Sequence, residues 1–259
     1  MAVTADDLLP EWRLRESFVK HAARAQLHRL WARTDGSPID DAFASSAAAA
    51  SFEEIRRSER LPPLNAVRLH LEGEDRVRVT TPDATISAGF VRSDDPLPKL
   101  VALDTSATAI APEHASTHRA RSTVHYFIGL VEHPARDPRP FRELMAERFS
   151  LGYTPDPITD VAALEAWIRG ALSSVVASEH VIHAIDVTED GGNKLYAEVR
   201  MTSQALFPDG SGAISRNTQR WTLHDTTGER FARVERIGIA RDAVEFFGPA
   251  PLYGPRQRP

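Results

Sequence analysis

Two histidines, His180 and His183, are the side chains of this 259-residue chain best suited to acid–base chemistry. They lie in a run of alternating apolar and polar residues, Ser178–Val187, which predicts a β-strand. Because successive strand residues point to opposite faces, only one of the two rings can point into a pocket beneath the sheet. A neutral imidazole in a dry pocket can take up or release a proton near neutral pH. The competing interpretation is a structural histidine that hydrogen-bonds a neighbouring strand.

Proton transfer needs a second polar group, and the best candidate is Tyr153. It lies in a loop between two predicted helices, one at 141–149 and one from 159 to about 177. Its competing interpretation is an aromatic residue that packs at a pocket rim. Alternation along the later strands places further candidates for substrate binding on the inward face. These are Met201, Ser203, Gln219 and Trp221. Trp167 lies in the apolar stripe of a predicted helix, either as a substrate contact or as a core residue.

The elements that must position these residues form a meander between Ala177 and Asp242. Four alternating runs predict four antiparallel strands, at 178–187, 194–207, 213–223 and 230–239. The segments between them are rich in Gly, Asp, Asn and Thr, which is turn chemistry. Because amphipathic helices precede the meander, we expect an α+β fold in which a curved antiparallel sheet packs on helices and leaves a pocket.

The sequence Leu-Glu-Ala-Trp-Ile-Arg at 164–169, the strand Ser178–Val187 and the run Tyr196–Met201 resemble the SnoaL-like branch of the nuclear transport factor 2-like superfamily. The resemblance covers about residues 140–242. It implies a cone-shaped sheet with an interior pocket, as in ketosteroid isomerase, scytalone dehydratase, polyketide cyclases and limonene epoxide hydrolase. His180 then resembles the histidine of scytalone dehydratase-like members, which makes it our first choice as the acid or base.

The resemblance implies a cofactor-free cyclase, isomerase or dehydratase that acts on an apolar, oxygenated small molecule. The alternative function is a non-catalytic binding or assembly protein of the same fold. The inward face of the meander is nearly free of carboxylates, which argues against the aspartate base of a steroid isomerase.

The first half repeats the order of helices followed by strands, with strands predicted as far as 117–131. Three prolines in 134–140 predict a linker. We therefore expect an N-terminal α+β domain (1–133), a SnoaL-like domain (141–247) and a flexible tail (248–259). The first half is either a divergent second copy or an unrelated α+β domain. A second copy could give a monomer with an internal pseudo-dimer, and a homodimer is the alternative.

Composition excludes several classes of function. A formal net charge of −5 gives no basic field for nucleic acid. No apolar stretch is long enough to span a membrane and no signal peptide is visible, so a cytoplasmic location is expected. Without cysteine there are no disulfides or thiolate sites. His114 and His118 have i, i+4 spacing, but their neighbours indicate a loop, so no metal is expected. The sequence has no Gly-rich phosphate loop or dinucleotide fingerprint, and no cofactor is expected.

Overall fold

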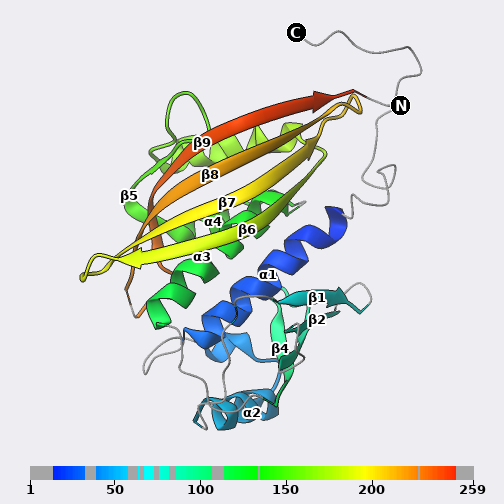
Figure 1. The fold of residues 1–259 in the computed structure, drawn as a ribbon, viewed down its shortest axis with the longest axis vertical. Helices are drawn as coiled ribbons and strands as arrows, with labels where there is room; N and C mark the ends of the chain where they lie inside the picture. Colours follow the sequence, from blue (N-terminus) through cyan, green and yellow to red (C-terminus); the bar gives the residue numbers. More distant parts are fainter. Residues whose placement is uncertain are drawn as a thin grey trace.

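The computed structural model places two β-sheets on either side of a central pair of helices, α1 (Leu14–Trp31) and α3 (Ala115–Glu132) (Figure 1). Helix α1 takes part in both hydrophobic cores, and α3 belongs to the core of the longer sheet. The structure describes residues 14–32, 39–57, 64, 67–72, 76–81, 86–106, 114–133, 135–226 and 228–248. The end of the predicted tail, from residue 249, lies outside these residues. No helix in the described ranges is long and apolar enough to cross a membrane.

The longer sheet contains the predicted meander and has the order β5-β9-β8-β7-β6. Strands β6 to β9 are antiparallel and 13 to 15 residues long, whereas the short strand β5 runs parallel to β9. Gly191 and Gly210 have φ values of 83° and 79° in the turns that join the strands, a conformation that favours glycine. The predicted curved antiparallel sheet over helices is confirmed. Its strands are β5 (Met145–Leu151), β6 (Ala177–Glu189), β7 (Lys194–Leu206), β8 (Gly212–His224) and β9 (Arg233–Phe247).

Two short helices, α4 (Arg139–Leu144) and α5 (Val161–Arg169), pack on the longer sheet. Asp160 caps α5 by accepting a hydrogen bond from the backbone N–H of Ala163, at 2.8 Å. The helix predicted for 141–149 is wrong in its second part, because the chain becomes strand β5 at Met145. The helix predicted from 159 to about 177 ends at Arg169, and a short 3-10 turn (Leu172–Ser174) precedes β6.

The strand predicted at 117–131 is wrong, since these residues form α3. Almost every residue of α3 from His118 onward is buried, because α1 covers one side and β6 and β7 cover another. A helix surrounded in this way loses the polar face that normally identifies it, and its β-branched and aromatic residues imitate a strand. Helix α3 precedes the predicted linker at 134–140 yet shares one core with α4 and β5. The body of the second half therefore begins before that linker.

The first half forms a four-stranded antiparallel meander in the order β1-β2-β3-β4, with a separate core. Ala23, Leu27 and Leu30 of α1 belong to this core, whereas Ala22 and Ala25 belong to the core of the longer sheet. Within the described residues, α1 thus lies between the two sheets, and they do not stack face to face as an internal pseudo-dimer would require. The first-half elements are η2 (Asp40–Ala42), α2 (Ser46–Arg57), β1 (Arg68–Leu71), β2 (Arg76–Thr80), β3 (Ile86–Val91) and β4 (Lys99–Thr105).

Candidate functional site

A carboxylate and an imidazole meet where the end of α3 faces the start of β6. Nδ1 of His180 lies 2.9 Å from Oε1 of Glu132, and the same oxygen accepts the backbone N–H of His180. The Glu132 side chain is 0% exposed and the His180 side chain is 14% exposed. Nε2 of His21, on α1, donates to the carbonyl oxygen of His180 at 2.8 Å. No described residue hydrogen-bonds Nε2 of His180, so this nitrogen remains available to a ligand.

Alternation places the two histidines of β6 on opposite faces, and a β-bulge lies at the second of them. The pairing of β6 with β7 slips between Ile182 and Ala184, so that His183 has no partner in the register. His180 and Ile182 face the helices, and the slip returns Ile185 to the same side. The exposed His183 hydrogen-bonds Oγ1 of Thr202 at 2.9 Å. Of the two candidate histidines, only His180 contacts Glu132.

Polar side chains continue from His180 across the inner face of the sheet. Ser203 stands opposite His180 in the register, and its hydroxyl accepts a hydrogen bond from Nδ2 of Asn217 at 3.0 Å. Asn217 is only 6% exposed, and its Oδ1 has no hydrogen-bond partner among the described residues. The buried hydroxyl of Ser178, two residues before His180, also lacks one. Buried polar atoms without partners are uncommon in proteins and point to a missing water or ligand.

The other predicted site residues form an aromatic group further along the same face. Gln219 is its centre, because Oε1 accepts hydrogen bonds from the Tyr153 hydroxyl at 3.3 Å and from Nε1 of Trp221 at 3.1 Å. Nε2 of Gln219 lies 3.7 Å from Sδ of Met201. The Tyr153 ring stacks on Trp167, with ring centres 4.9 Å apart. Burial raises the pKa of the Tyr153 hydroxyl.

The structure therefore divides the predicted site residues into two groups. The residues of one group contact one another directly or through Gln219 on the inner face of the sheet. They are Tyr153, Trp167, Met201, Gln219 and Trp221. Ser203 belongs with His180 instead, two residues along β7 from Met201. Among the described residues, no hydrogen bond joins the His180 group to Tyr153.

Sequence reasoning missed a row of buried histidines between α1 and α3. Nδ1 of His21 lies 3.1 Å from Nδ1 of His125, and Nδ1 of His28 lies 3.0 Å from Nδ1 of His118. Burial lowers the pKa of all four rings, and lowers that of His118 to about 4. His118, which was read as a loop residue, lies within α3. The spacing could have indicated this row, because its two histidines on each helix are seven residues apart. Glu132 in turn follows His125 by seven residues.

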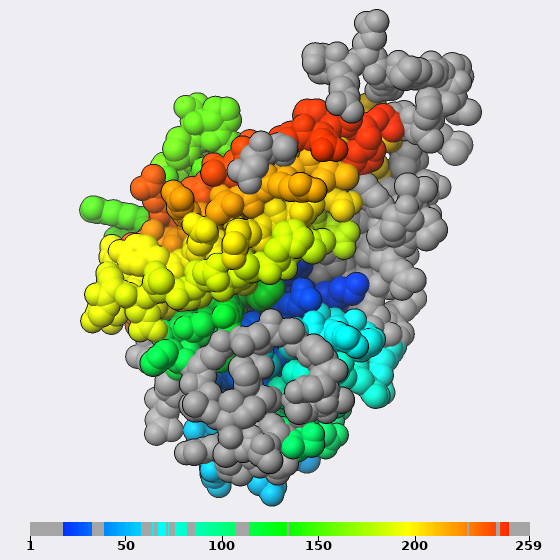
Figure 2. Space-filling model, viewed as in Figure 1, coloured from blue at the N-terminus to red at the C-terminus, as the bar shows by residue number. Residues whose placement is uncertain are grey.

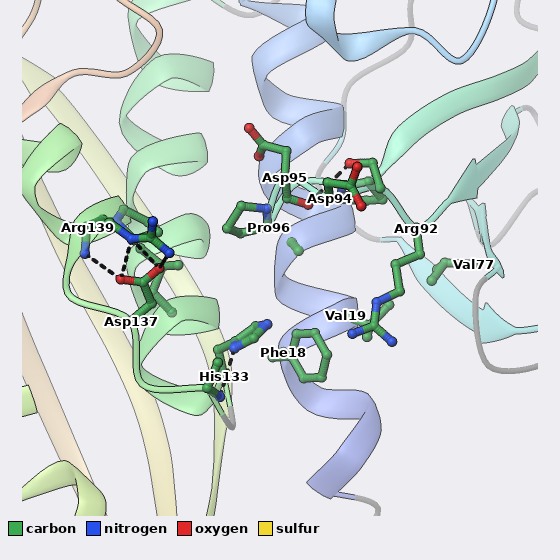
Figure 3. Close-up of a pocket in the computed structure, with 16 residues that line it drawn as sticks. Phe18, Val19, Val77, Arg92, Asp94, Asp95, Pro96, His133, Asp137 and Arg139 are labelled. Carbon is green, nitrogen blue, oxygen red and sulfur yellow. Dashed lines mark hydrogen bonds and ion pairs between the residues drawn. The ribbon is translucent and has the colours of Figure 1, made fainter. Parts of the chain in front are cut away.

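A separate cavity of about 610 Å³ opens between α1, the chain after β3 and the connection from α3 to α4 (Figure 3). The ring of Phe18 packs edge-on against that of His133, with centres 4.7 Å apart. Asp137 binds Arg139 on the far side of this cavity. None of the site residues predicted from the sequence lines it. Within the described ranges, no three His, Asp or Glu side chains are grouped to hold a metal ion.

Of three comparisons with known proteins, the comparison with solved structures found matches. No family model and no curated protein matches the sequence. An NTF2-like protein with a cystatin-like fold from Novosphingobium aromaticivorans is 19% identical, with a TM-score of 0.41, over 49% of this chain and 82% of that one. An NTF2-like superfamily protein from Salmonella enterica serovar Typhimurium is 12% identical, with a TM-score of 0.41, over 53% and 93%.

A hexachlorocyclohexane dehydrochlorinase from Novosphingobium barchaimii is 6% identical, with a TM-score of 0.44, over 54% of this chain and 98% of that one. Two of these three solved structures are described as NTF2-like, and all three correspond to about half of this chain.

Proposed function

We propose that this protein is a cofactor-free enzyme that transfers a proton on an apolar, oxygenated small molecule, by cyclase, isomerase or dehydratase chemistry. The observation that carries the proposal is the contact between Glu132 and His180. A buried carboxylate that accepts Nδ1–H of an imidazole fixes the tautomer in which Nε2 is the base. Nε2 of His180 has no partner among the described residues, so it is free to take a proton from a substrate.

The surroundings of His180 support a substrate that carries oxygen. Leaving a buried polar atom unsatisfied costs about 1–3 kcal/mol. A ligand hydroxyl that donates to Oδ1 of Asn217 removes this cost at one position, and Ser178 offers a second contact. The neighbouring group of Tyr153, Gln219 and Trp221 supplies an apolar wall with few exposed polar atoms.

The reaction needs no bond between substrate and protein. Nε2 of His180 accepts a proton from a carbon next to a carbonyl group, and the electron pair moves onto the carbonyl oxygen. Return of the proton to another atom completes an isomerisation. Departure of a β-hydroxyl group, which takes that proton and leaves as water, completes a dehydration. Glu132 positions the ring and balances the charge of the imidazolium that forms.

A non-catalytic binding or assembly protein is the second candidate, and one observation favours it. Four aromatic rings contact one another within the core and fill part of the space beneath the sheet. They belong to Phe127, Tyr153, Trp167 and Trp221. In this alternative Glu132 and His180 hold β6 against α3 and have no chemical role.

The oligomeric state is a separate prediction. Monomer and homodimer are the two alternatives, and light scattering distinguishes them.

Exchange of carbon-bound hydrogen in D₂O tests the proposal. The probes are 2-tetralone, whose α-hydrogens exchange with deuterium, and 4-hydroxy-4-phenylbutan-2-one, whose dehydration is followed by ultraviolet absorbance. We expect the wild type to accelerate at least one reaction and His180→Gln to lower that rate about 10²- to 10⁴-fold. His224→Gln, an exposed histidine of the same sheet, is the matched control and should retain the wild-type rate.

The same assay separates the two histidines of β6. His183→Gln should also retain the rate, because this ring points away from Glu132. If His183→Gln loses the activity and His180→Gln keeps it, the assignment is wrong. If a wider panel of apolar ketones shows no acceleration by the wild type, the non-catalytic alternative holds.

A further inference from the structure

A second cavity, of about 370 Å³, lies where α1 and α3 meet the edge strand β6. This volume is within the range of about 300–1,000 Å³ that is usual for small-molecule sites. Leu64, Val67 and Ile182 contribute apolar side chains to its lining. Its basic lining consists of two arginines and three histidines, Arg24, His28, Arg121, His125 and His183. Neither His180 nor Glu132 lines this cavity.

The positive charge of Arg24 is not neutralised by direct contact. Arg24 makes no hydrogen bond or ion pair with any described residue, and burial lowers the pKa of its guanidinium group. The buried Glu132 partly offsets this effect through its charge, without an ion pair. Among the described residues of the lining, Asp186 is the one carboxylate, and it is ion-paired at 3.0 Å with the exposed Arg200. Arg24 is half-buried, and a partly buried charge without a partner is costly, so the site favours an anion.

Two of the histidines, His28 and His125, offer further polar contacts. Nδ1 of His28 is occupied by His118, and Nδ1 of His125 is occupied by His21. No described residue hydrogen-bonds Nε2 of either ring. The two rings are nearly parallel, with centres 5.7 Å apart and an interplanar angle of 7°, so they form one continuous wall.

We infer that this cavity binds a small molecule through an oxyanion, a carboxylate or a phosphate group. Arg24 faces the charge, since a guanidinium group matches the geometry of both oxyanions. Leu64, Val67 and Ile182 contact the apolar part of the ligand. This binding site is separate from the Glu132–His180 pair and does not depend on the proposed enzymatic activity.

Isothermal titration calorimetry at constant ionic strength tests the inference, with inorganic phosphate and succinate as separate probes. We expect saturable binding of at least one of them to the wild type, and the stronger probe identifies the class of oxyanion. Arg24→Gln should weaken that binding at least tenfold. Arg148→Gln, an exposed arginine on β5 at the opposite edge of the sheet, is the matched control and should bind as the wild type does.

Two further measurements keep the test decisive if Arg24→Gln does not fold. Ala184→Glu places a carboxylate in the lining while retaining both arginines, and it should also abolish binding. In the wild type, the ring resonances of His28 and His125 should shift on titration, whereas those of the exposed His224 should not. Absence of saturable binding of both anions, or equal loss in the Arg24 and Arg148 variants, overturns the inference.

Discussion

Glu132 is the residue on which the proposed chemistry depends, because it fixes the ring of His180 and is itself fully buried. Its oxygen Oε2 has no hydrogen-bond partner among the described residues. A carboxylate buried in this way is held by the strand and helix around it, and it contributes little to stability by itself. Its contact with Nδ1 of His180 fits a role in positioning that ring.

Replacing Glu132 by Gln tests this role at the level of one side chain. A glutamine amide can donate to Nδ1 and so favour the tautomer whose Nε2 is already protonated. We expect Glu132→Gln to lower the rate of proton exchange about 10- to 10³-fold and to alter its pH profile. Glu147→Gln, on the exposed side of β5, should change neither. A purely structural role predicts a change in stability with an unchanged pH profile.

The pairing of α1 with α3 decides which side chains surround the site, and the sequence predicted this pairing poorly. The meander could be predicted because its turns and its alternation agree. Helix α3 could not, because burial on nearly all sides removed its helical periodicity. Since residues 117–131 were read as a strand, neither Glu132 nor the histidine row was placed beside His180. Alternation along the strand predicts that His180 points inward and His183 outward. The bulge at His183 could not be predicted from the sequence.

A double-mutant cycle on His28 and His118 tests the contact between the two helices. His118→Leu leaves Nδ1 of His28 without its partner and should lower the free energy of unfolding by about 1–3 kcal/mol. Replacing both residues by Leu removes the polar pair together and should cost less than the sum of the single changes. The exposed His70→Leu serves as the control, with a change within about 0.5 kcal/mol. Additive losses would show that the two rings do not interact.

The whole molecule carries four buried histidines that remain neutral on folding, and this makes its stability depend on pH. Burial lowers the pKa of His21, His28, His118 and His125 from the ordinary 6.5. Below pH 6.5 the unfolded chain binds protons that the folded chain does not, so the free energy of unfolding falls as the pH falls. For His118 the loss of free energy of unfolding is spread between pH 6.5 and about pH 4. Above 7 these groups contribute no pH dependence.

Chemical denaturation at several pH values measures this effect. Each such histidine contributes a slope of up to about 1.4 kcal/mol per pH unit in the window where only the unfolded state is protonated. We expect the wild type to lose stability between pH 6.5 and 5, and His28→Leu/His118→Leu to show a shallower slope. Equal slopes in the two proteins would mean that these rings are not kept neutral by the fold.

Glu132 and His180 are proposed to act as one acid–base unit, and the exchange rate of a double variant tests this most directly. Residues that act together lose activity non-additively, so that removing the second costs little after the first is gone. We predict that Glu132→Gln/His180→Gln exchanges carbon-bound hydrogen as slowly as His180→Gln alone. Independent losses that multiply in the double variant, or a His180→Gln protein as active as the wild type, would contradict the account.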